Sequence, residues 1–351
     1  MNKIITIDGK EIGEGRPTYI IAEMSANHLM DFDRAKEIIR LAKESGADAI
    51  KLQTYRPDTI TIDCRGEEFL ATKGSPWEGM NLYELYKTAY TPWEWHQALF
   101  DYAKELGITC FSSPFDFTAV DLLEELGAPA YKIASFEIND IPLIRKVAKT
   151  GKPIIISTGI AETEDVELAL ETCRKEGNEN VILLKCASEY PTPYEDLNLK
   201  TITDMKDKYD CIAGLSDHSM GSAVDVAAIS LGACVIEKHI TIRRADGGPD
   251  GSFSMEPEEF QEMTANIRRV EKALGKVSYD LTEKQRKSRD LSRSLYVVKD
   301  MKKGEIFTEE NVKSIRPGFG LHTKYYDEIL GKPCTMDLSF GTALKWDHVE
   351  K

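Results

Sequence analysis

The sequence predicts an α/β protein, a (β/α)8 TIM barrel followed by a small β-rich domain, and three observations support this. From residue 19 onward, short apolar or alternating runs alternate with amphipathic stretches, as in repeated strand and helix units. This alternation continues for eight units and ends near residue 275. The rest of the chain contains brief strand-like runs broken by Lys-Gly, Pro-Gly and Phe-Gly turns. A chain of 351 residues has room for a barrel and a second domain.

Each predicted unit is a strand followed by a helix. The predicted strands are 19–24, 49–55, 109–115, 130–136, 153–159, 181–188, 211–218 and 234–241. Stretches such as 33–46, 117–127, 163–177 and 256–275 have apolar residues at i, i+3 and i+4 and end in glycine, which is typical of amphipathic helices. Eight successive units favour a closed barrel. A doubly wound open sheet is the alternative, but no G-x-G-x-x-G follows the first strand to support a dinucleotide fold.

We expect three segments along the chain. Residues 1–275 form the barrel domain, residues 276–292 are a polar, charged linker, and residues 293–351 form the small domain. Because the small domain has a small core of its own, we expect it to dock onto a barrel. The N-terminus lacks the apolar segment of a signal peptide, and no apolar run approaches the roughly 20 residues of a membrane span, so we expect a soluble, cytoplasmic protein.

Acidic residues dominate the charge of the chain. The formal net charge is -14 and the pI is about 5.1. Such a field repels polyanions and argues against nucleic acid or an anionic membrane as a partner. An anionic substrate therefore has to be bound by local basic groups. The seven cysteines are scattered and never spaced as C-x-x-C, so the sequence predicts reduced thiols and neither a disulfide framework nor a zinc ribbon.

Polar side chains occur near the C-terminal end of nearly every predicted strand. In a barrel these strand ends line the catalytic face. Several of them are two residues apart, which places them on one face of their strand. Because the pattern recurs on strand after strand, we interpret it as one shared site. The residues are Glu23, Lys51, Gln53, Ser113, Lys132, Ser135, Glu137, Ser157, Ser188, Tyr190, Ser216, His218, Glu237 and His239.

Two histidines predict a metal site. His218 and His239 end the seventh and eighth predicted strands, which are neighbours about 4.8 Å apart if the barrel closes in sequence order. A site with two strong ligands, completed by water and substrate oxygens, fits Mn²⁺ better than a closed structural zinc, with Mg²⁺ or Co²⁺ as alternatives. Either histidine alone would be interpreted as a hydrogen-bonding group inside the barrel.

Two lysines predict an anion site. Lys51 and Lys132 lie in apolar-flanked strands, so we expect them inside the barrel, where a lysine requires an anionic partner. Together with the nearby serine hydroxyls they suit a small phosphate or carboxylate. Glu23 and Glu137 supply two carboxylates at the same face, able to bind sugar hydroxyls or to move protons.

Motifs along essentially the whole chain resemble the sialic acid synthase family. In order they are IAEMSANH, IKLQTY, FSSPFD, YKIASFEI, ISTGIA, CASEYPTP, GLSDHS, IEKHIT and GGPDGSFS. The later SLYVVKDMKKGEIFTEENVKSIRPGFGL resembles the antifreeze-like (SAF, β-clip) domain of the same family. Members of the family condense phosphoenolpyruvate with an open-chain N-acetylated amino sugar and release phosphate. The resemblance therefore implies a transferase that forms a C–C bond and a nine-carbon 2-keto acid.

The resemblance also implies roles for the matching residues. The positions that match the phosphoenolpyruvate site are Lys51, Ser113, Lys132, Ser135, Ser157, Ser188 and Ser216. Those that match the sugar site are Glu23, Gln53, Tyr190, Asp250 and Arg316. His218 and His239 match the Mn²⁺ ligands. Glu137 is the candidate for handling the proton of the water that adds before phosphate leaves, and Glu23 is the second candidate catalytic carboxylate. Ser188 departs from the family, because many members have asparagine there.

The RPG motif of the small domain implies a dimer. In the family this domain crosses to the partner subunit, where the arginine of the motif reaches the sugar site. Arg316 is the matching position, so the resemblance implies a domain-swapped homodimer. Without the resemblance, Arg316 would be interpreted as capping a local turn.

An aromatic insertion at residues 74–96, between the second predicted strand and its helix, predicts a lid over the catalytic face. The sequence of this insertion resembles that of family members that use 2,4-diacetamido-2,4,6-trideoxy-altrose. It is less similar to members that make N-acetylneuraminate or legionaminate. That sugar is less polar than N-acetylmannosamine, which favours contacts with Trp77, Tyr83 or Trp93. Packing of these aromatic side chains onto the barrel is the alternative.

Two other classes of function remain open. A metal-dependent aldolase on the same barrel would not consume phosphoenolpyruvate, so phosphate release separates it from a synthase. A non-enzymatic carbohydrate-binding or ice-binding protein, built around the small domain, leaves the strand-end histidines and lysines unexplained.

Overall fold

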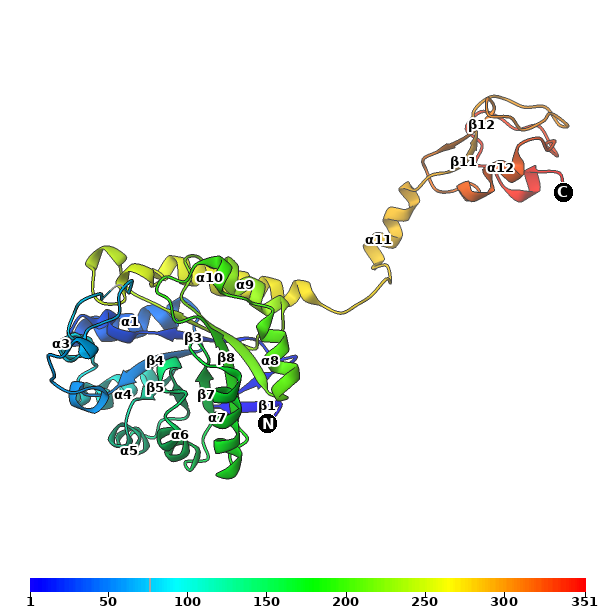
Figure 1. Ribbon diagram of the computed structural model, residues 1–351. Helices are drawn as coiled ribbons and strands as arrows, with labels where there is room; N and C mark the ends of the chain where they lie inside the picture. The colour runs from blue at the N-terminus through cyan, green and yellow to red at the C-terminus, as the bar shows by residue number, and fades with distance from the viewer. Residues whose placement is uncertain (76) are drawn as a thin grey trace. The chain divides into compact units, whose positions relative to one another are not determined.

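A computed structural model describes residues 1–75 and 77–351 and divides the chain into two compact units, Met1–Gly275 and Lys276–Lys351 (Figure 1). The first unit contains a hairpin and eight further strands, with helices between them. Its strands are β1 (Ile4–Ile7), β2 (Lys10–Gly13), β3 (Tyr19–Glu23), β4 (Ala49–Thr54), β5 (Thr109–Pro114), β6 (Tyr131–Ile133), β7 (Ile154–Ser157), β8 (Val181–Cys186), β9 (Ile212–Asp217) and β10 (Val235–His239). Its helices are α1 (Phe32–Glu44), α2 (Pro57–Ile60), α3 (Leu82–Ala89), α4 (His96–Leu106), α5 (Phe117–Glu125), α6 (Ile141–Ala148), α7 (Thr163–Lys175), α8 (Thr201–Tyr209), α9 (Ala223–Ser230) and α10 (Pro257–Leu274).

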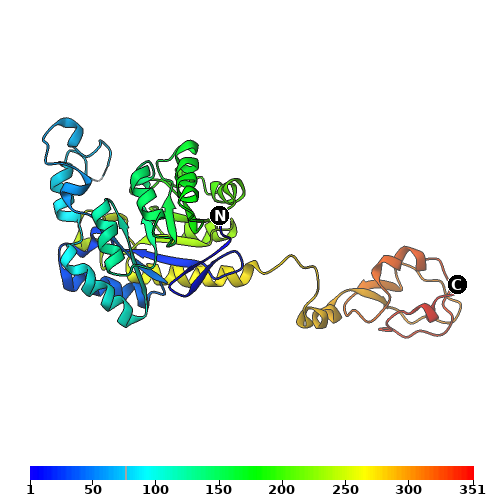
Figure 2. The same ribbon diagram turned by 90° about the horizontal axis from the view of Figure 1, so that it is seen from below.

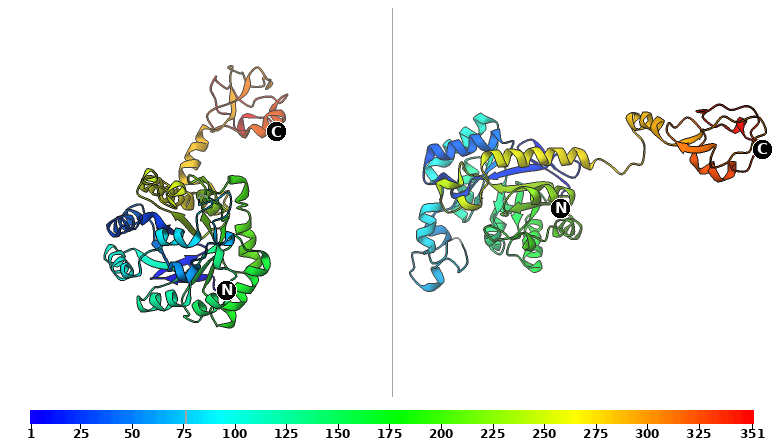
Figure 3. Two further views of the ribbon diagram at one scale, coloured as in Figure 1. Left: turned by 60° about the vertical axis from the view of Figure 1, so that its left-hand side comes forward. Right: turned by 90° about the horizontal axis from the view of Figure 1, so that it is seen from above.

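The eight strands β3 to β10 close into a parallel barrel. They follow one another in sequence order, and β10 pairs with β3 to complete the ring. Helices surround the strands, as Figure 3 shows in two views. The predicted (β/α)8 barrel is therefore confirmed, and the open sheet is excluded.

Helix ends follow local signals in the sequence. The Asp116 carboxylate accepts hydrogen bonds from the backbone N–H of Thr118 at 2.6 Å and of Ala119 at 3.2 Å, and so begins α5. Gly107, with a φ of 66°, ends α4 in the left-handed conformation that glycine adopts without a steric penalty.

The interior of the barrel is apolar at one end and polar at the other. Inward side chains such as Ile21, Phe111 and Leu184 form a buried cluster, and the β1–β2 hairpin adds isoleucines to it. Each fully buried isoleucine of the hairpin stabilises the fold by roughly 1.5–3 kcal/mol. Because the hairpin and the apolar cluster fill the N-terminal end of the barrel, a site for a polar ligand has to lie at the C-terminal strand ends.

The chain between β4 and α4 carries α2 and α3 and extends away from the body of the barrel, as Figure 2 shows. This segment contains the predicted lid, apart from Pro76, which lies outside the described residues. In the part of the chain that the structure describes, no helix combines the length and the apolar character needed to cross a membrane.

The second unit has a small core of its own. It contains α11 (Glu283–Ser288), β11 (Ser294–Val297), β12 (Val312–Ile315) and α12 (Tyr326–Ile329). β11 and β12 pair antiparallel, and isolated strand pairings such as Met301 with Leu338 extend the β-rich character. Side chains that include Leu295, Val312 and Leu344 bury the core.

Candidate active site

The strand register gathers the predicted site residues at the C-terminal end of the barrel. Glu23 lies opposite Lys51 on β4 and opposite His239 on β10. Glu237 on β10 lies opposite Ser216 on β9. The two-residue alternation of a strand turns these side chains to the interior.

A buried ionic cluster occupies the centre of this face; we call Glu23, Lys51, Lys132 and Glu237 the inner cluster. The Lys51 Nζ lies 2.8 Å from the Glu23 Oε2 and 2.8 Å from the Glu237 Oε1. The Lys132 Nζ donates to the same Glu237 oxygen at 3.2 Å. No side chain of the inner cluster is more than 5% exposed. Lysines from two strands, β4 and β6, thus share one carboxylate from β10.

The charges of the inner cluster shift the pKa values of its own members. Burial alone would raise the pKa of Glu237, but Lys132 and Lys51 outweigh it and hold that pKa well below its usual range. Burial and the Lys132 charge lower the pKa of Lys51 to about 7, although Glu237 opposes the shift. The two lysines are offset by two carboxylates within the cluster itself. A bound phosphate ester would therefore need a further cation for charge balance.

Buried hydroxyl groups without partners surround the inner cluster. In the described part of the chain, the Oγ atoms of Ser113, Ser157 and Ser188 are buried and form no hydrogen bond. Buried polar groups are nearly always hydrogen-bonded in folded proteins, so these three point to a polar ligand. A Cβ on Gly159 would lie 2.2 Å from the Ser188 Oγ and 2.7 Å from the Ser135 Oγ. The absence of a side chain at Gly159 thus keeps open a cradle between two predicted phosphate ligands.

The predicted metal ligands face each other. The ring centroids of His218 and His239 are 5.2 Å apart. The His218 Nδ1 donates to the Ala187 carbonyl at 3.0 Å, which leaves its Nε2 as the metal-binding nitrogen. The His239 Nδ1 is buried and has no hydrogen-bond partner among the described residues. Burial and the neighbouring His218 hold the His239 pKa well below its usual range. A neutral imidazole such as that of His239 fits a divalent metal. Burial alone would lower the pKa of His218, but Cys186 and the Ala187 carbonyl outweigh it and raise that pKa.

In the described chain, His218 and His239 are the predicted ligands of such a metal. Within residues 1–75 and 77–351, no group of three or more His, Cys, Asp or Glu side chains is arranged to hold an ion. The donor set therefore fits an ion that completes its coordination with water and substrate oxygens, and it does not fit a closed structural zinc.

The predicted sugar ligands meet through a residue that the sequence analysis did not single out. The Gln53 Nε2 donates to the Ser25 Oγ at 3.0 Å and to the Glu23 Oε1 at 3.4 Å. The Ser25 Oγ donates to the Asp250 Oδ2, which also accepts from the Ala26 N–H at 3.3 Å. Glu23, Gln53 and Asp250 are thereby brought together from three different segments.

Glu137 has the properties of a proton-transfer group. It ends the short helical turn Ser135–Glu137 after β6, and its buried Oε2 forms no hydrogen bond with any part of the chain that the structure describes. Burial, with Asp140 adding to it, raises the pKa of Glu137 to about 7, although Lys132 opposes the shift. A carboxyl group with this pKa accepts and releases protons near neutral pH.

The aromatic residues of the insertion divide into two groups. The Trp77 indole N–H donates to the Pro249 carbonyl at 3.0 Å, and its ring centroid lies 5.6 Å from that of Tyr190. The Tyr190 ring in turn lies 4.4 Å from the His218 ring. Trp93 instead donates to the Tyr55 carbonyl at 3.0 Å and stacks on Arg56. Trp77 thus reaches the site, whereas Trp93 packs the insertion onto the barrel.

Tyr83 lies on α3, and Arg316 belongs to the second unit. The Tyr83 ring contacts Lys87 within α3. Arg316 is exposed in the small unit, directly after β12. Its predicted part in sugar binding stays a prediction.

Sequence reasoning missed three features of the site. Glu237 was placed at a strand end without a role, yet it is the shared partner of both lysines. Cys186 is one of the predicted reduced thiols without an assigned role, and its Sγ lies 3.8 Å from the His218 Nδ1. The two-residue alternation in VILLKCAS and CVIEKHIT already turns both side chains inward. The third is Ser25, whose contacts depend on loops that no periodicity describes.

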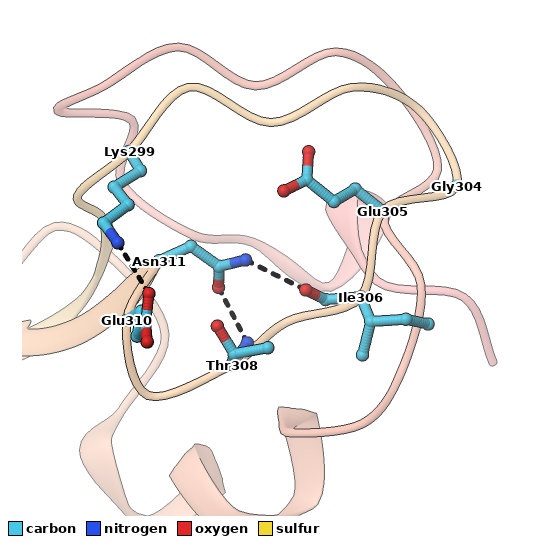
Figure 4. A pocket seen from close by; sticks show the side chains of 7 residues that line it. All are labelled: Lys299, Gly304, Glu305, Ile306, Thr308, Glu310 and Asn311. Atoms are coloured by element: carbon cyan, nitrogen blue, oxygen red, sulfur yellow. Dashed lines mark hydrogen bonds and ion pairs between the residues drawn. The ribbon is translucent and has the colours of Figure 1, made fainter.

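The small unit has a cavity of its own, with a volume of about 530 Å³ (Figure 4). Its polar lining groups are already paired: Lys299 with Glu310 at 2.8 Å, and the Asn311 side chain with the Thr308 N–H and the Ile306 carbonyl. Among the described residues, every buried side-chain polar atom without a partner belongs to the barrel unit. The barrel face is therefore the better candidate site.

Comparisons with known proteins agree with this geometry. Residues 38–279 match the NeuB family and residues 292–350 match the SAF domain. A pseudaminic acid synthase of Campylobacter jejuni is 49% identical over 330 residues, which cover 94% of this chain and 96% of that protein. The N,N'-diacetyllegionaminic acid synthase of the same species is 38% identical over 325 residues, 91% of this chain and 96% of that protein.

Solved structures are similar as well. The crystal structure of an N-acetylneuraminic acid (sialic acid) synthetase from Leptospira borgpetersenii, in complex with citrate, superposes with a TM-score of 0.72 at 32% sequence identity. The match covers 82% of this chain and 95% of that one.

Proposed function

The chain belongs to the NeuB family, and we propose that it is a pseudaminic acid synthase. The reaction joins phosphoenolpyruvate to 2,4-diacetamido-2,4,6-trideoxy-β-L-altropyranose, consumes water and releases phosphate. The observation that carries this proposal is the inner cluster with its ring of unpartnered serine hydroxyls, which suits a phosphorylated carboxylic acid.

The chain's own residues bind and orient the first substrate. Lys51 and Lys132 contribute the positive charge, and the hydroxyls of Ser113, Ser157 and Ser188 contribute hydrogen bonds. Ser135 and Ser216 belong to the same set, since Ser135 borders the Gly159 cradle and Ser216 donates to Glu237 at 3.2 Å. Holding the two substrates side by side contributes a large part of the rate enhancement.

The metal site follows from His218 and His239, and we propose Mn²⁺, with Mg²⁺ or Co²⁺ as alternatives. When bound, the ion polarises the sugar aldehyde as a Lewis acid and supplies the positive charge that the inner cluster lacks. The two imidazoles hold it from neighbouring strands, β9 and β10.

Glu137 is the group that accepts a proton from the attacking water. The enolpyruvate carbon attacks the sugar aldehyde, positive charge develops on the carbon that carries phosphate, and water adds there before phosphate leaves. The half-buried Glu137 carboxylate takes the proton of that water. Glu23, Gln53, Tyr190 and Asp250 orient the sugar, and Glu23 is also positioned to exchange a proton.

Sugar selection is the second part of the proposal. Of the two Campylobacter synthases, the one named for pseudaminic acid is more similar to this chain, at 49% against 38% identity. Trp77 and Tyr190 form an apolar wall beside the histidines, which favours a deoxy sugar with two acetamido groups.

A homodimer and a cytoplasmic location complete the proposal. We propose that Arg316 reaches the sugar site of a second copy of this chain, as the family resemblance implies. Phosphoenolpyruvate is a cytoplasmic metabolite, which supports that location. A monomer in light scattering that remains active at low concentration would contradict the role of Arg316.

The experiment that tests the function is phosphate release from phosphoenolpyruvate with Mn²⁺. The diacetamido altrose sugar, its manno isomer and N-acetylmannosamine are offered in parallel, and product masses are determined. Preference for the altrose sugar supports pseudaminate synthesis, and preference for another sugar moves the specificity to legionaminate or N-acetylneuraminate. Absence of phosphate release with all three contradicts a synthase. The same panel with Trp77→Ala tests the apolar wall, and Trp93→Ala serves as the control because Trp93 packs elsewhere.

A further inference from the structure

Ser25 has an unusual backbone conformation at the edge of the proposed sugar site. It is the first residue of a short helical turn, Ser25–His28, that follows β3. Its φ is 45°, in the left-handed region that side chains other than glycine rarely adopt. The residue is 3% exposed, so protein groups rather than solvent surround it. Strained residues of this kind persist where surrounding structure enforces them, often at functional sites.

The polar groups of Ser25 contact three side chains that we assign to the sugar. Its backbone N–H donates to the Glu23 Oε1 at 2.9 Å. Its hydroxyl donates to the Asp250 Oδ2 and accepts from the Gln53 Nε2 at 3.0 Å. The three side chains come from β3, β4 and the loop after β10, so Ser25 is their common contact.

Neighbouring bonds hold the turn against the loop that carries Asp250. The Asn27 Nδ2 donates to the Ile240 carbonyl and to the Ser254 Oγ, both at 2.9 Å. The Ser254 Oγ donates to the Asp250 carbonyl at 2.6 Å. These bonds fix the backbone on both sides of the Ser25 and Asp250 contact. The turn is therefore rigid enough to enforce the conformation of Ser25.

Glycine would satisfy the backbone at this position better than serine does. It adopts a positive φ without strain, but it has no hydroxyl group. A serine here makes physical sense if the hydroxyl is needed. Burial raises the pKa of Asp250, and the Ser25 hydroxyl opposes that shift, so the contact also favours the ionised carboxylate.

We propose that Ser25 is a positioning residue of the sugar site, whose N–H and hydroxyl set the orientation of Glu23, Gln53 and Asp250 toward an acetamido sugar. The inference rests on the proposed function for the identity of the ligand. Ser25 acts through its neighbours and takes no part in the chemical step.

The test compares Ser25→Gly with Ser25→Ala in the full chain. Both variants remove the hydroxyl, but only the glycine variant also removes the backbone strain. We expect kcat/KM for the sugar to fall by about 10- to 100-fold in both, as for loss of a hydrogen bond to a charged group. KM for phosphoenolpyruvate should stay within about twofold of the native value. Ser45→Ala is the matched control, because Ser45 is a buried serine whose hydroxyl bonds the Pro257 carbonyl away from the site.

A purely structural role predicts a different result. The glycine variant would then match or exceed the native chain in both thermal stability and kcat/KM for the sugar, and this outcome overturns the proposal. Crystal structures of the native chain and the glycine variant test the positioning without turnover. We expect the Gln53 amide and the Asp250 carboxylate to change orientation in the variant, and unchanged orientations of both overturn the proposal. A native chain that releases no phosphate with any sugar contradicts the proposed function and leaves the crystallographic test decisive for Ser25.

Discussion

Two buried lysine–carboxylate clusters meet at adjacent residues of β10, Glu237 and Lys238, and differ in how their lysines are paired. The inner cluster faces the barrel interior through Glu237. The second, which we call the outer cluster, consists of Asp217, Asp225 and Lys238 and faces the helices. Lys238 directly follows Glu237, and the alternation of a strand sends the two side chains to opposite sides.

We call the outer cluster closed because its lysine donates to three protein oxygens, although both Asp225 carboxylate oxygens lack a hydrogen bond in the described chain. The Lys238 Nζ donates to the Asp217 carboxylate, to the Ser219 carbonyl at 2.7 Å and to the Gly221 carbonyl at 3.1 Å. Burial and the neighbouring Asp217 raise the pKa of Asp225 well above its usual value, although Lys238 opposes the shift. The hydrogen bonds of Lys238 hold the loop after β9 against β10.

The inner cluster has binding capacity left over. Lys51 and Lys132 share one oxygen of Glu237, while the other oxygen and three nearby serine hydroxyls have no partner in the described chain. Equal burial therefore does not imply an equal role. The closed cluster stabilises the fold, and the open cluster is arranged for a ligand that the fold itself does not supply.

The largest effect is expected from Lys238→Met. The change leaves the Asp217 carboxylate buried without its cation, which lowers the free energy of unfolding by about 3–5 kcal/mol. Urea denaturation measures this loss. Phosphate release per folded molecule, assayed at low temperature, should remain close to native. A variant with native stability and reduced turnover would reverse the roles that we assign to the two clusters.

Lys132→Met tests the inner cluster in the opposite sense. We expect kcat/KM for phosphoenolpyruvate to fall by about 100- to 1,000-fold, because a charged group aimed at the phosphorylated substrate is removed. Glu237 keeps Lys51 and Ser216 as partners, so stability should fall less than in Lys238→Met. Phosphate release and urea denaturation on the same preparation give both numbers. Near-native kcat/KM would remove Lys132 from the substrate site.

Buried histidines extend the comparison between closed and open groups. His28 accepts from the Met30 N–H at 3.0 Å, and His96 contacts the Thr54 hydroxyl at 2.8 Å. Burial lowers the pKa of both to about 4. Since the unfolded value is about 6.5, their contribution to stability is complete above that pH and is lost as the pH falls toward 4. We expect a loss on the order of 2 kcal/mol for each histidine.

Chemical denaturation at pH 7 and at pH 4.5 measures this loss, with His96→Gln as the comparison. The glutamine variant should be less stable than the native chain at pH 7 and should lose less stability on acidification. An identical pH dependence in the two proteins would show that His96 is not the titrating group.

The smallest effect is expected from Gly159→Ala. The added Cβ would lie 2.2 Å from the Ser188 Oγ and 2.7 Å from the Ser135 Oγ, so both hydroxyls have to turn away. KM for phosphoenolpyruvate should rise by about 10- to 100-fold, while KM for the sugar changes little. The two KM values are measured by phosphate release with the other substrate saturating. An equal rise in both would indicate a general disturbance of the barrel face.

Much of this organisation is predictable from the sequence, because it depends on periodicity. The eight strands and the inward direction of residues such as Lys51, Ser216 and His239 follow from the two-residue repeat and the order of the units. The pairing partners do not follow from it. The sharing of Glu237 by two lysines depends on side chains that meet across the barrel, and Ser25 meets Asp250 only because two loops pack together. Contacts of this kind join residues more than 100 positions apart, which no local pattern encodes.

The family resemblance predicts some site residues that local periodicity does not. Asp250 lies in a loop with no strand periodicity. Its assignment to the sugar site rests on the resemblance of the GGPDGSFS motif to the family. The structure places its carboxylate next to Ser25, within the group of predicted sugar ligands. Arg316 came from the same source, and its role requires a measurement on the assembled protein.

The most direct test of the account is a crystal structure of the chain with phosphoenolpyruvate and Mn²⁺. We predict the phosphate and carboxylate groups on Lys51, Lys132 and the unpartnered serine hydroxyls, with the ion between His218 and His239 and the outer cluster unchanged. Phosphoenolpyruvate bound elsewhere, or a barrel face that excludes it at saturating concentration, would contradict the claim that the inner cluster is the substrate site.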